Sequence, residues 1–359
     1  MNPRLKDKLA KRKKEGTLRV LSDFEGFIDF CSNDYLGLSR ESIYFNEISH
    51  SGTGSRLISG TSKEALSAER ELAVFFNAQS ALLFNSGYDA NLGLFSSVPQ
   101  HGDTVIYDEL IHASIRDGIR LGFSRGKSFV HNDLQDLENK LSETQGVIYV
   151  VVEGLYSMDG DFSPLLQITE ICEKYGAYLI VDEAHSAGLF GDSGKGLVSQ
   201  LGIENKVFAR LVTFGKAYGS HGACVLGSSE LTEVLVNFAR SFIYTTALPP
   251  KSYIRNSKII TFESLEQRRA QLQENLKLFR SGFLHSGLIS ELNSPIQILE
   301  IGDVAVTKSC ASDLQKNGIA VKPIYAPTVL MGKERIRLCF HSFNTEKEIK
   351  QLIRSMPTE

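Results

Sequence analysis

The chain has 359 residues, and its 39 Lys and Arg against 42 Asp and Glu leave a formal net charge of −3. This near-neutral balance gives no general attraction to nucleic acid or to anionic lipid, so we expect neither as a partner. At 42% hydrophobic and 23% charged residues, the composition excludes a disordered or fibrous protein. A chain this long is expected to fold as a large domain with a smaller one.

Signals for export, membrane insertion and metal binding are missing from the sequence. Residues 1–16 are charged throughout and lack the apolar centre of a secretory signal. The longest purely apolar run, residues 147–152, is far shorter than the roughly 20 residues of a membrane span. The five cysteines are scattered and form no CxxC pair, which argues against a disulfide framework and a thiolate zinc site. We therefore expect a cytoplasmic protein with reduced thiols.

The chain opens with two expected helices, separated by the strand-like run FIDFCS, and a series of strands follows. Residues 3–15 predict a short basic helix, and a second helix is expected from Thr61, which forms a capping-box pattern with Glu64. Between residues 81 and 227, apolar runs alternate with helical patterns. The runs are ALLF, TVIYD, SFV, GVIYVVV, AYLIV, ARLVTF and ACVLG. Most of these runs are too continuously apolar for one face of the strand to be exposed to solvent. This indicates an α/β fold with a mostly parallel central sheet covered by helices.

The pattern of apolar and charged residues changes after the last of these strands. From Pro249 a long charged helical region leads to strand-like runs interleaved with helices, namely IQILEI, IAVKPI and RIRLCF. We expect an N-terminal segment at residues 1–50 and a large α/β domain at 51–248. Residues 249–359 would form a linking helix and a small α+β domain.

The string AYLIVDEAHSAGLFG places Asp182 and His185 where a buried strand ends, the position at which open α/β sheets bind ligands. Asp-Glu-Ala-His is also a spelling found in nucleic-acid-dependent ATPases, but no Gly-Lys pair has the glycine that a phosphate-binding loop needs before it. The interpretation as a serine hydrolase fails, because the nearest match to the GxSxG motif, GDSGK at 191–195, lacks the last glycine. The interpretation as a dinucleotide-binding protein also fails. GTGSRL at 52–57 has leucine where the GxGxxG motif requires its third glycine. A purely structural role for Asp182, capping the next turn, stays open.

A second string, TFGKAYGSHG, places Lys216 after an apolar strand among small residues. Most lysines are solvated surface charges, but desolvation at such a position favours the neutral amine that attacks carbonyls. Pyridoxal phosphate accounts for both strings, because an amine bonds its aldehyde and a buried carboxylate such as Asp182 keeps its pyridine nitrogen protonated. In ALLFNSGYDANLG, residues 86–88 open a helix whose N-terminus can hold the phosphate. An ordinary strand-to-helix turn would show the same pattern.

A series of strings along nearly the whole chain resembles the α-oxoamine synthases. In order they are SNDYLGLS, GTGSRLISGT, FNSGYDANLG, DELIHASIRDGIRL, EGLYSMDGD, VDEAHSAGLFG, TFGKAYGSHG, FIYTTALPP and APTV…ERIRLCFH. The resemblance implies a pyridoxal phosphate-dependent acyltransferase of fold type I. It also implies decarboxylative condensation of L-alanine with a pimeloyl thioester to 8-amino-7-oxononanoate in biotin biosynthesis. The thioester carrier would be coenzyme A or an acyl carrier protein, and glycine or serine with another acyl-CoA is the alternative.

The resemblance also implies roles for the cofactor residues. Lys216 would bond the cofactor, Asp182 would pair with the pyridinium, and His185 would lie against the phenolic oxygen. His112 would stack on the ring, although a helix N-terminal histidine satisfied by backbone is the alternative. The other cofactor contacts would come from Ser86, Gly87, Tyr88, Ser157, Thr213, Thr245 and Thr246.

Substrate binding and assembly follow from the same resemblance. Thr245 or Thr246 would reach the phosphate of a neighbouring subunit, which implies a homodimer with shared active sites. Arg337 would take the amino-acid carboxylate as a bidentate partner, with Asn33 in the same cleft. Arg19 matches an arginine near the acyl substrate.

Two departures from the family and one basic cluster bear on the acyl substrate. The segment between Leu38 and Gly52 is short, so we expect a reshaped substrate entrance. Tyr325 stands where many of these enzymes have arginine, which changes the expected acyl-chain contacts. A basic cluster in the first helix could meet coenzyme A or an acidic acyl carrier protein, or form a solvated helix face. It comprises Lys6, Lys8, Lys11, Arg12, Lys13 and Lys14.

Overall fold

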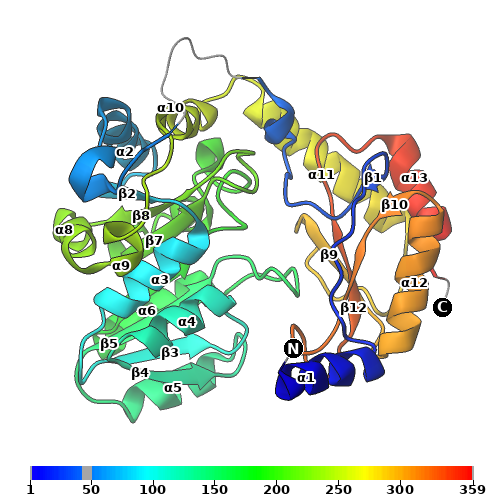
Figure 1. Cartoon of the computed structure of the whole chain (residues 1–359), viewed down its shortest axis with the longest axis horizontal. Helices are drawn as coiled ribbons and strands as arrows, with labels where there is room; N and C mark the ends of the chain where they lie inside the picture. Colours follow the sequence, from blue (N-terminus) through cyan, green and yellow to red (C-terminus); the bar gives the residue numbers. More distant parts are fainter. Residues whose placement is uncertain (1, 43–50, 358–359) are drawn as a thin grey trace. The chain divides into compact units, whose positions relative to one another are not determined.

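The computed structural model describes residues 2–42 and 51–357, which divide into two compact units. The larger unit comprises Leu36–Ser157 and Phe162–Gln267, and the smaller one Met1–Tyr35, Met158–Asp161 and Arg268–Glu359. Figure 1 shows the elements of both. The expected boundary at residue 50 and residues 43–50 of the short entrance segment lie outside the described residues.

A seven-stranded sheet forms the core of the larger unit, in the order β2-β8-β7-β6-β5-β3-β4. Its strands are β2 (Ser80–Phe84), β3 (Thr104–Asp108), β4 (Arg125–Phe129), β5 (Ile148–Glu153), β6 (Tyr178–Asp182), β7 (Val207–Thr213) and β8 (Ala223–Gly227). Strand β8 is antiparallel to both of its neighbours, whereas the other pairings are parallel. Every residue of β5 is buried, as expected for a strand with both faces covered. The predicted mostly parallel sheet is confirmed.

Helices surround this sheet (Figure 1). They are α2 (Lys63–Phe75), α3 (Gly87–Ser97), α4 (Ala113–Leu121), α5 (Leu134–Ser142), α6 (Leu165–Tyr175), α7 (Leu197–Gln200), α8 (Ser229–Phe238), α9 (Arg240–Ile243) and α10 (Pro250–Ile259). Helix α3 packs against α4, β7 and β8. Its Ala90 and Leu94 are fully buried in a cluster with Leu211 and Val225 of the sheet. This packing fixes the N-terminus of α3 relative to the strand ends.

Helix α2 begins one residue later than expected. Its N-cap is Ser62, whose hydroxyl accepts a backbone N–H of the first turn at 3.2 Å. The hydroxyl of Thr61 instead donates to the Arg56 carbonyl at 2.5 Å and accepts from Arg56 Nε at 3.2 Å. The predicted capping box of Thr61 with Glu64 is therefore wrong, because Arg56 occupies the hydroxyl that the box requires.

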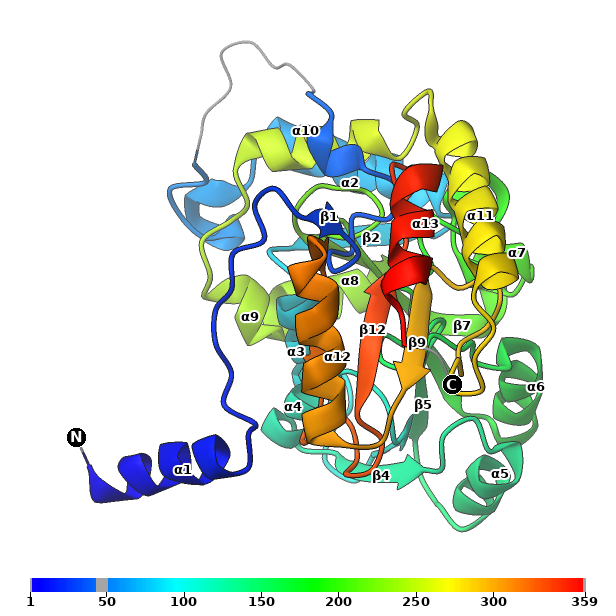
Figure 2. The same cartoon turned by 90° about the vertical axis from the view of Figure 1, so that its right-hand side faces the viewer.

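The smaller unit is an α+β arrangement. Its strands are β1 (Ile28–Asp29), β9 (Ile296–Glu300), β10 (Ile319–Ala320), β11 (Lys322–Ile324) and β12 (Arg335–Cys339). Its helices are α1 (Pro3–Lys14), α12 (Val304–Lys316), α13 (Glu346–Ser355) and most of α11 (Leu265–Gly282). Strands β11, β12 and β9 form an antiparallel sheet against which α12 packs (Figure 2). Within the described residues, no helix has an apolar stretch that could cross a bilayer.

An N-terminal segment and C-terminal segments pair with each other in the smaller unit. Strand β1 pairs in parallel with β10, and the Cys339 N–H donates to the Phe30 carbonyl at 2.9 Å. Residues up to Tyr35 therefore cluster with the C-terminal residues, while residues 249–267 cluster with the larger unit. This division differs from the expected boundaries because those followed chain order, whereas strand pairing joins segments that are distant in sequence.

Candidate active site

The end of β6 places a fixed carboxylate inside the larger unit. Asp182 is the last residue of β6 and is 6% exposed. Its Oδ1 accepts the Ala184 N–H at 2.9 Å, and its Oδ2 accepts from Asn91 Nδ2 of α3 at 3.0 Å. His185 is also buried, in the turn that follows the strand. Donors from two elements thus hold the acid in one orientation.

Lys216 lies in the turn between β7 and β8 and is partly buried. The Ser220 N–H closes the turn on the Phe214 carbonyl at 2.7 Å. Tyr218 is fully buried and donates its hydroxyl to a backbone carbonyl at 3.1 Å. Gly219 has φ +53°, and a Cβ there would lie 2.1 Å from a backbone nitrogen, so only glycine suits the position. The turn carrying the lysine is therefore rigid.

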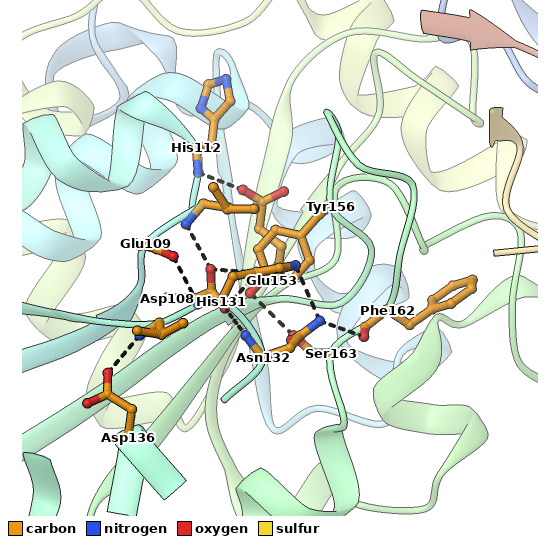
Figure 3. A network of polar contacts seen from close by, with 12 residues as sticks. Asp108, Glu109, His112, His131, Asn132, Asp136, Glu153, Tyr156, Phe162 and Ser163 are labelled. Carbon is orange, nitrogen blue, oxygen red and sulfur yellow. Dashed lines mark hydrogen bonds and ion pairs between the residues drawn. The ribbon is translucent and has the colours of Figure 1, made fainter. Parts of the chain in front are cut away.

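His112 is the N-cap residue of α4, and Glu153 holds its backbone (Figure 3). The His112 N–H donates to Glu153 Oε1 at 2.6 Å. Glu153 ends β5 and is the register partner of Asp182 on β6. Burial, reinforced by the negative charge of Asp182, raises the pKa of Glu153 to about 8. Two carboxyl groups thus end neighbouring strands, and burial favours the protonated form of Glu153.

The lysine, the acid and the imidazole lie close enough to influence one another. Burial lowers the pKa of His112, Asp182 opposes that shift, and the charge of Lys216 adds to it. The pKa of Glu153 also responds to Asp182 and Lys216. The larger unit therefore brings the predicted residues Lys216, Asp182 and His112 together at the carboxyl ends of β3, β5, β6 and β7.

A second polar network secures the end of β3 next to His112 (Figure 3). The Asp108 carboxylate accepts from His131 Nδ1 at 2.9 Å and from the Asn132 N–H at 3.0 Å. The His131 ring meets Tyr156 edge-on, with 4.5 Å between centroids. The Tyr156 hydroxyl in turn accepts the Glu153 N–H at 3.4 Å. These contacts tie the ends of β3 and β5 into one framework.

The N-terminus of α3 lies against the end of β7. Ser86 caps the helix by accepting the Asp89 N–H at 3.1 Å. A Cβ on Gly87 would lie 2.7 Å from Thr213 Cγ2, so glycine allows the helix to approach the strand this closely. First-turn N–H groups have no acceptor within their helix, so Gly87 and Tyr88 present donors at the positive end of the helix dipole. This cradle suits a phosphate group.

The remaining predicted cofactor residues also belong to the larger unit. Asn85 Nδ2 donates to Thr245 Oγ1 at 3.1 Å and to the Thr246 carbonyl at 2.8 Å, so both threonines lie next to the residue before Ser86. Ser157 is partly buried in the loop after β5. A role for either threonine in a neighbouring subunit stays a prediction.

The predicted substrate residues all belong to the smaller unit. Arg337 Nη2 on β12 donates to Asn33 Oδ1 at 2.9 Å, and the same oxygen accepts the Tyr35 hydroxyl at 3.1 Å. Arg19 donates to Thr328 Oγ1 at 3.1 Å in an exposed position. The structure thus joins Arg337 to Asn33 and places Arg19 in a separate contact.

Three buried polar residues around the site escaped the sequence analysis: Asn91, Ser114 and Glu153. Glu153 carried a signal, because it ends the apolar run IYVVVE just as Asp182 ends its own strand. Asn91 and Ser114 carried none, since single polar residues are ordinary within helical segments.

Pyridoxal phosphate needs an amine for its aldehyde, an acid for its pyridine nitrogen and donors for its phosphate. Lys216, Asp182 and the cradle at Gly87 meet these needs along one edge of the sheet, so the residues present fit the cofactor. Fold and site together define a pyridoxal phosphate-dependent enzyme of fold type I.

The chain belongs to the aminotransferase class I and II family, whose model matches residues 25–356. It is 40% identical to the 8-amino-7-oxononanoate synthase of Emericella nidulans, covering 99% of this chain and 93% of that protein. It is 38% identical to the Cellvibrio japonicus enzyme of the same name, covering 94% and 87%. These relatives confirm the resemblance to the α-oxoamine synthases.

Solved structures give the same fold. Serine palmitoyltransferase of Sphingomonas wittichii superimposes with a TM-score of 0.89 at 27% identity, covering 99% of this chain and 95% of that one. The 8-amino-7-oxononanoate synthase of Francisella tularensis gives a TM-score of 0.75 at 31% identity, covering 92% and 97%.

Proposed function

We propose that this chain condenses L-alanine with a pimeloyl thioester, releasing the thiol and carbon dioxide and leaving 8-amino-7-oxononanoate in biotin biosynthesis. One observation carries the proposal: 99% of the chain aligns at 40% identity with a protein named for that product. The arrangement of Lys216, Asp182 and His112 at one sheet edge supplies the chemistry that the reaction needs.

When bound, pyridoxal phosphate withdraws electrons from the substrate carbon that carries the amino group, so that a bond to that carbon can break. Lys216 would bond the cofactor and, once released, would take the proton from that carbon as a general base. Asp182 would keep the pyridine nitrogen protonated, because its carboxylate is buried and held by two donors. His185 would donate to the phenolic oxygen, and Ser157 would contact the ring edge.

The other site residues would bind and orient. His112 would lie on the ring face, and either His112 or Lys216 would return a proton to the product. Arg337 would hold the alanine carboxylate, and its bond to Asn33 fixes the direction of the guanidinium. Orientation of the carboxylate selects which bond at the substrate carbon breaks. The cradle of Gly87 and Thr213 would hold the phosphate.

We also propose that two copies of the chain assemble around shared sites. Leu57, Ile58 and Tyr244 are 50%, 86% and 72% exposed. They belong to one surface, since the Ala247 N–H donates to the Gly54 carbonyl at 2.9 Å and α9 contacts the segment at residues 56–60. Exposed apolar side chains grouped in this way favour a protein interface. The surface adjoins Thr245 and Thr246, which would reach the partner's phosphate.

The assembly is tested by light scattering after size-exclusion chromatography. Ile58→Glu should yield a monomer that has lost most of its activity, because the charge opposes burial of the surface. Leu284→Glu, at an equally exposed leucine of the smaller unit, is the matched control and should leave the dimer intact. A wild-type monomer with full activity would exclude shared sites.

The acyl substrate would meet the smaller unit. Helix α1 buries no side chain and carries seven basic residues, which suits the phosphates of coenzyme A or an acidic acyl carrier protein. Arg19 would lie near the acyl group. The Tyr325 ring is covered by the Lys308 ammonium at 5.4 Å, so this residue pair would supply the positive charge that arginine gives elsewhere. The five free cysteines support a reducing compartment, and we propose the cytoplasm.

A substrate screen tests the reaction. Alanine, glycine and serine are each paired with pimeloyl, acetyl and palmitoyl thioesters, and product is identified by mass spectrometry. We expect the highest kcat/KM for alanine with pimeloyl thioester. A preference for glycine with acetyl-CoA would refute the proposal.

A second candidate is serine acylation with a long-chain thioester. It is favoured by the TM-score of 0.89 with a serine palmitoyltransferase, against 0.75 for the Francisella tularensis synthase. In the same screen, turnover of serine with palmitoyl-CoA above that of alanine with pimeloyl thioester would select this candidate.

A further inference from the structure

Buried hydrogen bonds connect Asp182 to His112 through two residues without an assigned role. Asn91 Nδ2 lies 3.0 Å from Asp182 Oδ2 and 3.1 Å from Ser114 Oγ. Ser114 Oγ in turn lies 2.7 Å from His112 Nδ1. Asn91 is 3% exposed and Ser114 is fully buried, so water does not compete for these contacts.

Elementary hydrogen-bond chemistry fixes the direction of each contact. An ionised carboxylate only accepts, so the amide nitrogen of Asn91 must face Asp182. Its second N–H then points at Ser114 Oγ, which therefore accepts. The hydroxyl proton of Ser114 is left to donate to His112 Nδ1.

A second donor reaches the same ring nitrogen. The Ser114 backbone N–H points at His112 Nδ1 from 3.2 Å. A backbone N–H can only donate, so Nδ1 must be unprotonated, and the ring proton of neutral His112 resides on Nε2.

The surrounding charges favour the neutral ring on balance. Burial lowers the pKa of His112, Asp182 and Asp117 oppose that shift, and Lys216 adds to it. Glu153 faces the backbone of His112 from β5 and itself favours its proton.

We propose that Asn91 and Ser114 are positioning residues, which link Asp182 to His112 through hydrogen bonds and hold His112 as the neutral imidazole with its proton on Nε2. Asp182 and His112 are thereby oriented by one buried chain. In the proposed reaction, His112 then presents an uncharged face and a single N–H donor. The assignment of the ring proton stands without the proposed function, whereas its kinetic consequence rests on it.

Nitrogen-15 NMR of histidine-labelled protein, free of cofactor, tests the ring proton. The chain has eight histidines, so the His112 signals are assigned by their loss in His112→Gln. At pH 7.5 we expect an unprotonated Nδ1 and a protonated Nε2. A proton on Nδ1, or a cationic ring, would overturn the proposal whatever the reaction proves to be.

Ser114→Ala tests the link itself. Removing a donor to the neutral ring raises the His112 pKa, so the NMR titration should move to higher pH, as should the acid limb of kcat/KM. The kcat should fall about tenfold, as expected for one lost buried hydrogen bond. Ser114→Thr restores a hydroxyl and should recover the wild-type titration.

Ser97→Ala is the matched control, because Ser97 is also buried and donates its hydroxyl to a helix carbonyl, that of Gly93, at 2.6 Å. It should leave the His112 titration unchanged. Equal shifts in both variants would reduce Ser114 to a structural role and refute the link. If Ser114→Ala fails to fold, the wild-type NMR measurement still decides the ring proton.

Discussion

The two units assemble their functional groups in different ways. In the larger unit, Glu153 and Asp182 end neighbouring parallel strands, and Lys216 follows the next one. In the smaller unit, Arg337 on an antiparallel strand meets Asn33 from the opposite end of the chain. A parallel sheet gathers groups at one edge by its own geometry, because all its carboxyl ends point the same way. An antiparallel sheet needs a separate segment to return to it.

The units also anchor their arginines differently. Arg210 pairs with fully buried Glu183 at 2.7 Å, directly after Asp182 in sequence. Arg335 pairs with Asp159 at 2.6 Å and with Glu300 at 3.4 Å, and those two carboxylate side chains are 22% and 21% exposed. Removal of Arg210 from the larger unit should therefore lower the free energy of unfolding more than removal of Arg335 from the smaller unit.

The largest expected effect concerns chemistry in the larger unit. Lys216→Ala should lower kcat/KM by about 10⁴-fold or more, because it removes both the covalent partner and the base. Steady-state kinetics and borohydride labelling measure the change. Lys206→Ala, at a surface lysine paired with Glu173, is the control. Retention of a borohydride-stable label in Lys216→Ala would place the covalent bond elsewhere.

The second effect compares stability in the two units. Arg210→Ala leaves Glu183 charged and buried, and should lower the free energy of unfolding by about 3–5 kcal/mol. Arg335→Ala should lower the free energy of unfolding by clearly less, because water reaches the carboxylates of both Asp159 and Glu300. Urea denaturation measures both variants. Equal losses would show that exposure of the partner carboxylates does not distinguish the units.

The third effect isolates the smaller unit. Arg337→Lys removes the planar guanidinium that suits a carboxylate and that contacts Asn33. The KM for alanine should rise about 10–100-fold, corresponding to roughly 1.5–3 kcal/mol for a charged hydrogen bond, with little change in the KM for the thioester. A selective rise in the thioester KM instead would assign Arg337 to the acyl substrate.

The smallest effect is a pH dependence in the larger unit. The pKa of Glu153 rises from an ordinary value of 4.5 to about 8 on folding, so between these values the native state binds more protons than the unfolded state. This group therefore makes stability fall as pH rises through that window, with no further change above it. Glu153→Gln should flatten the dependence, as measured by denaturation at a series of pH values. An unchanged slope would mean that Glu153 is ionised in the fold.

Much of the larger unit could be predicted because its signals are local. The runs TVIYD and ACVLG coincide with β3 and β8. The capping box at Thr61 failed because a hydroxyl has several possible local partners, and their distances alone decide between them.

The sequence by itself determined the fold class, the family and the candidate cofactor residues. Apolar runs specify buried strands; the acid Asp182 follows one of them directly, and the amine of Lys216 follows another after Gly215. The tertiary structure alone decided the bond of Arg337 to Asn33 and the chain from Asp182 through Asn91 and Ser114 to His112. All of these contacts except that of Ser114 with His112 join residues distant in sequence. Hydrogen bonds require positions correct to a few tenths of an ångström, which only packing of the whole unit provides.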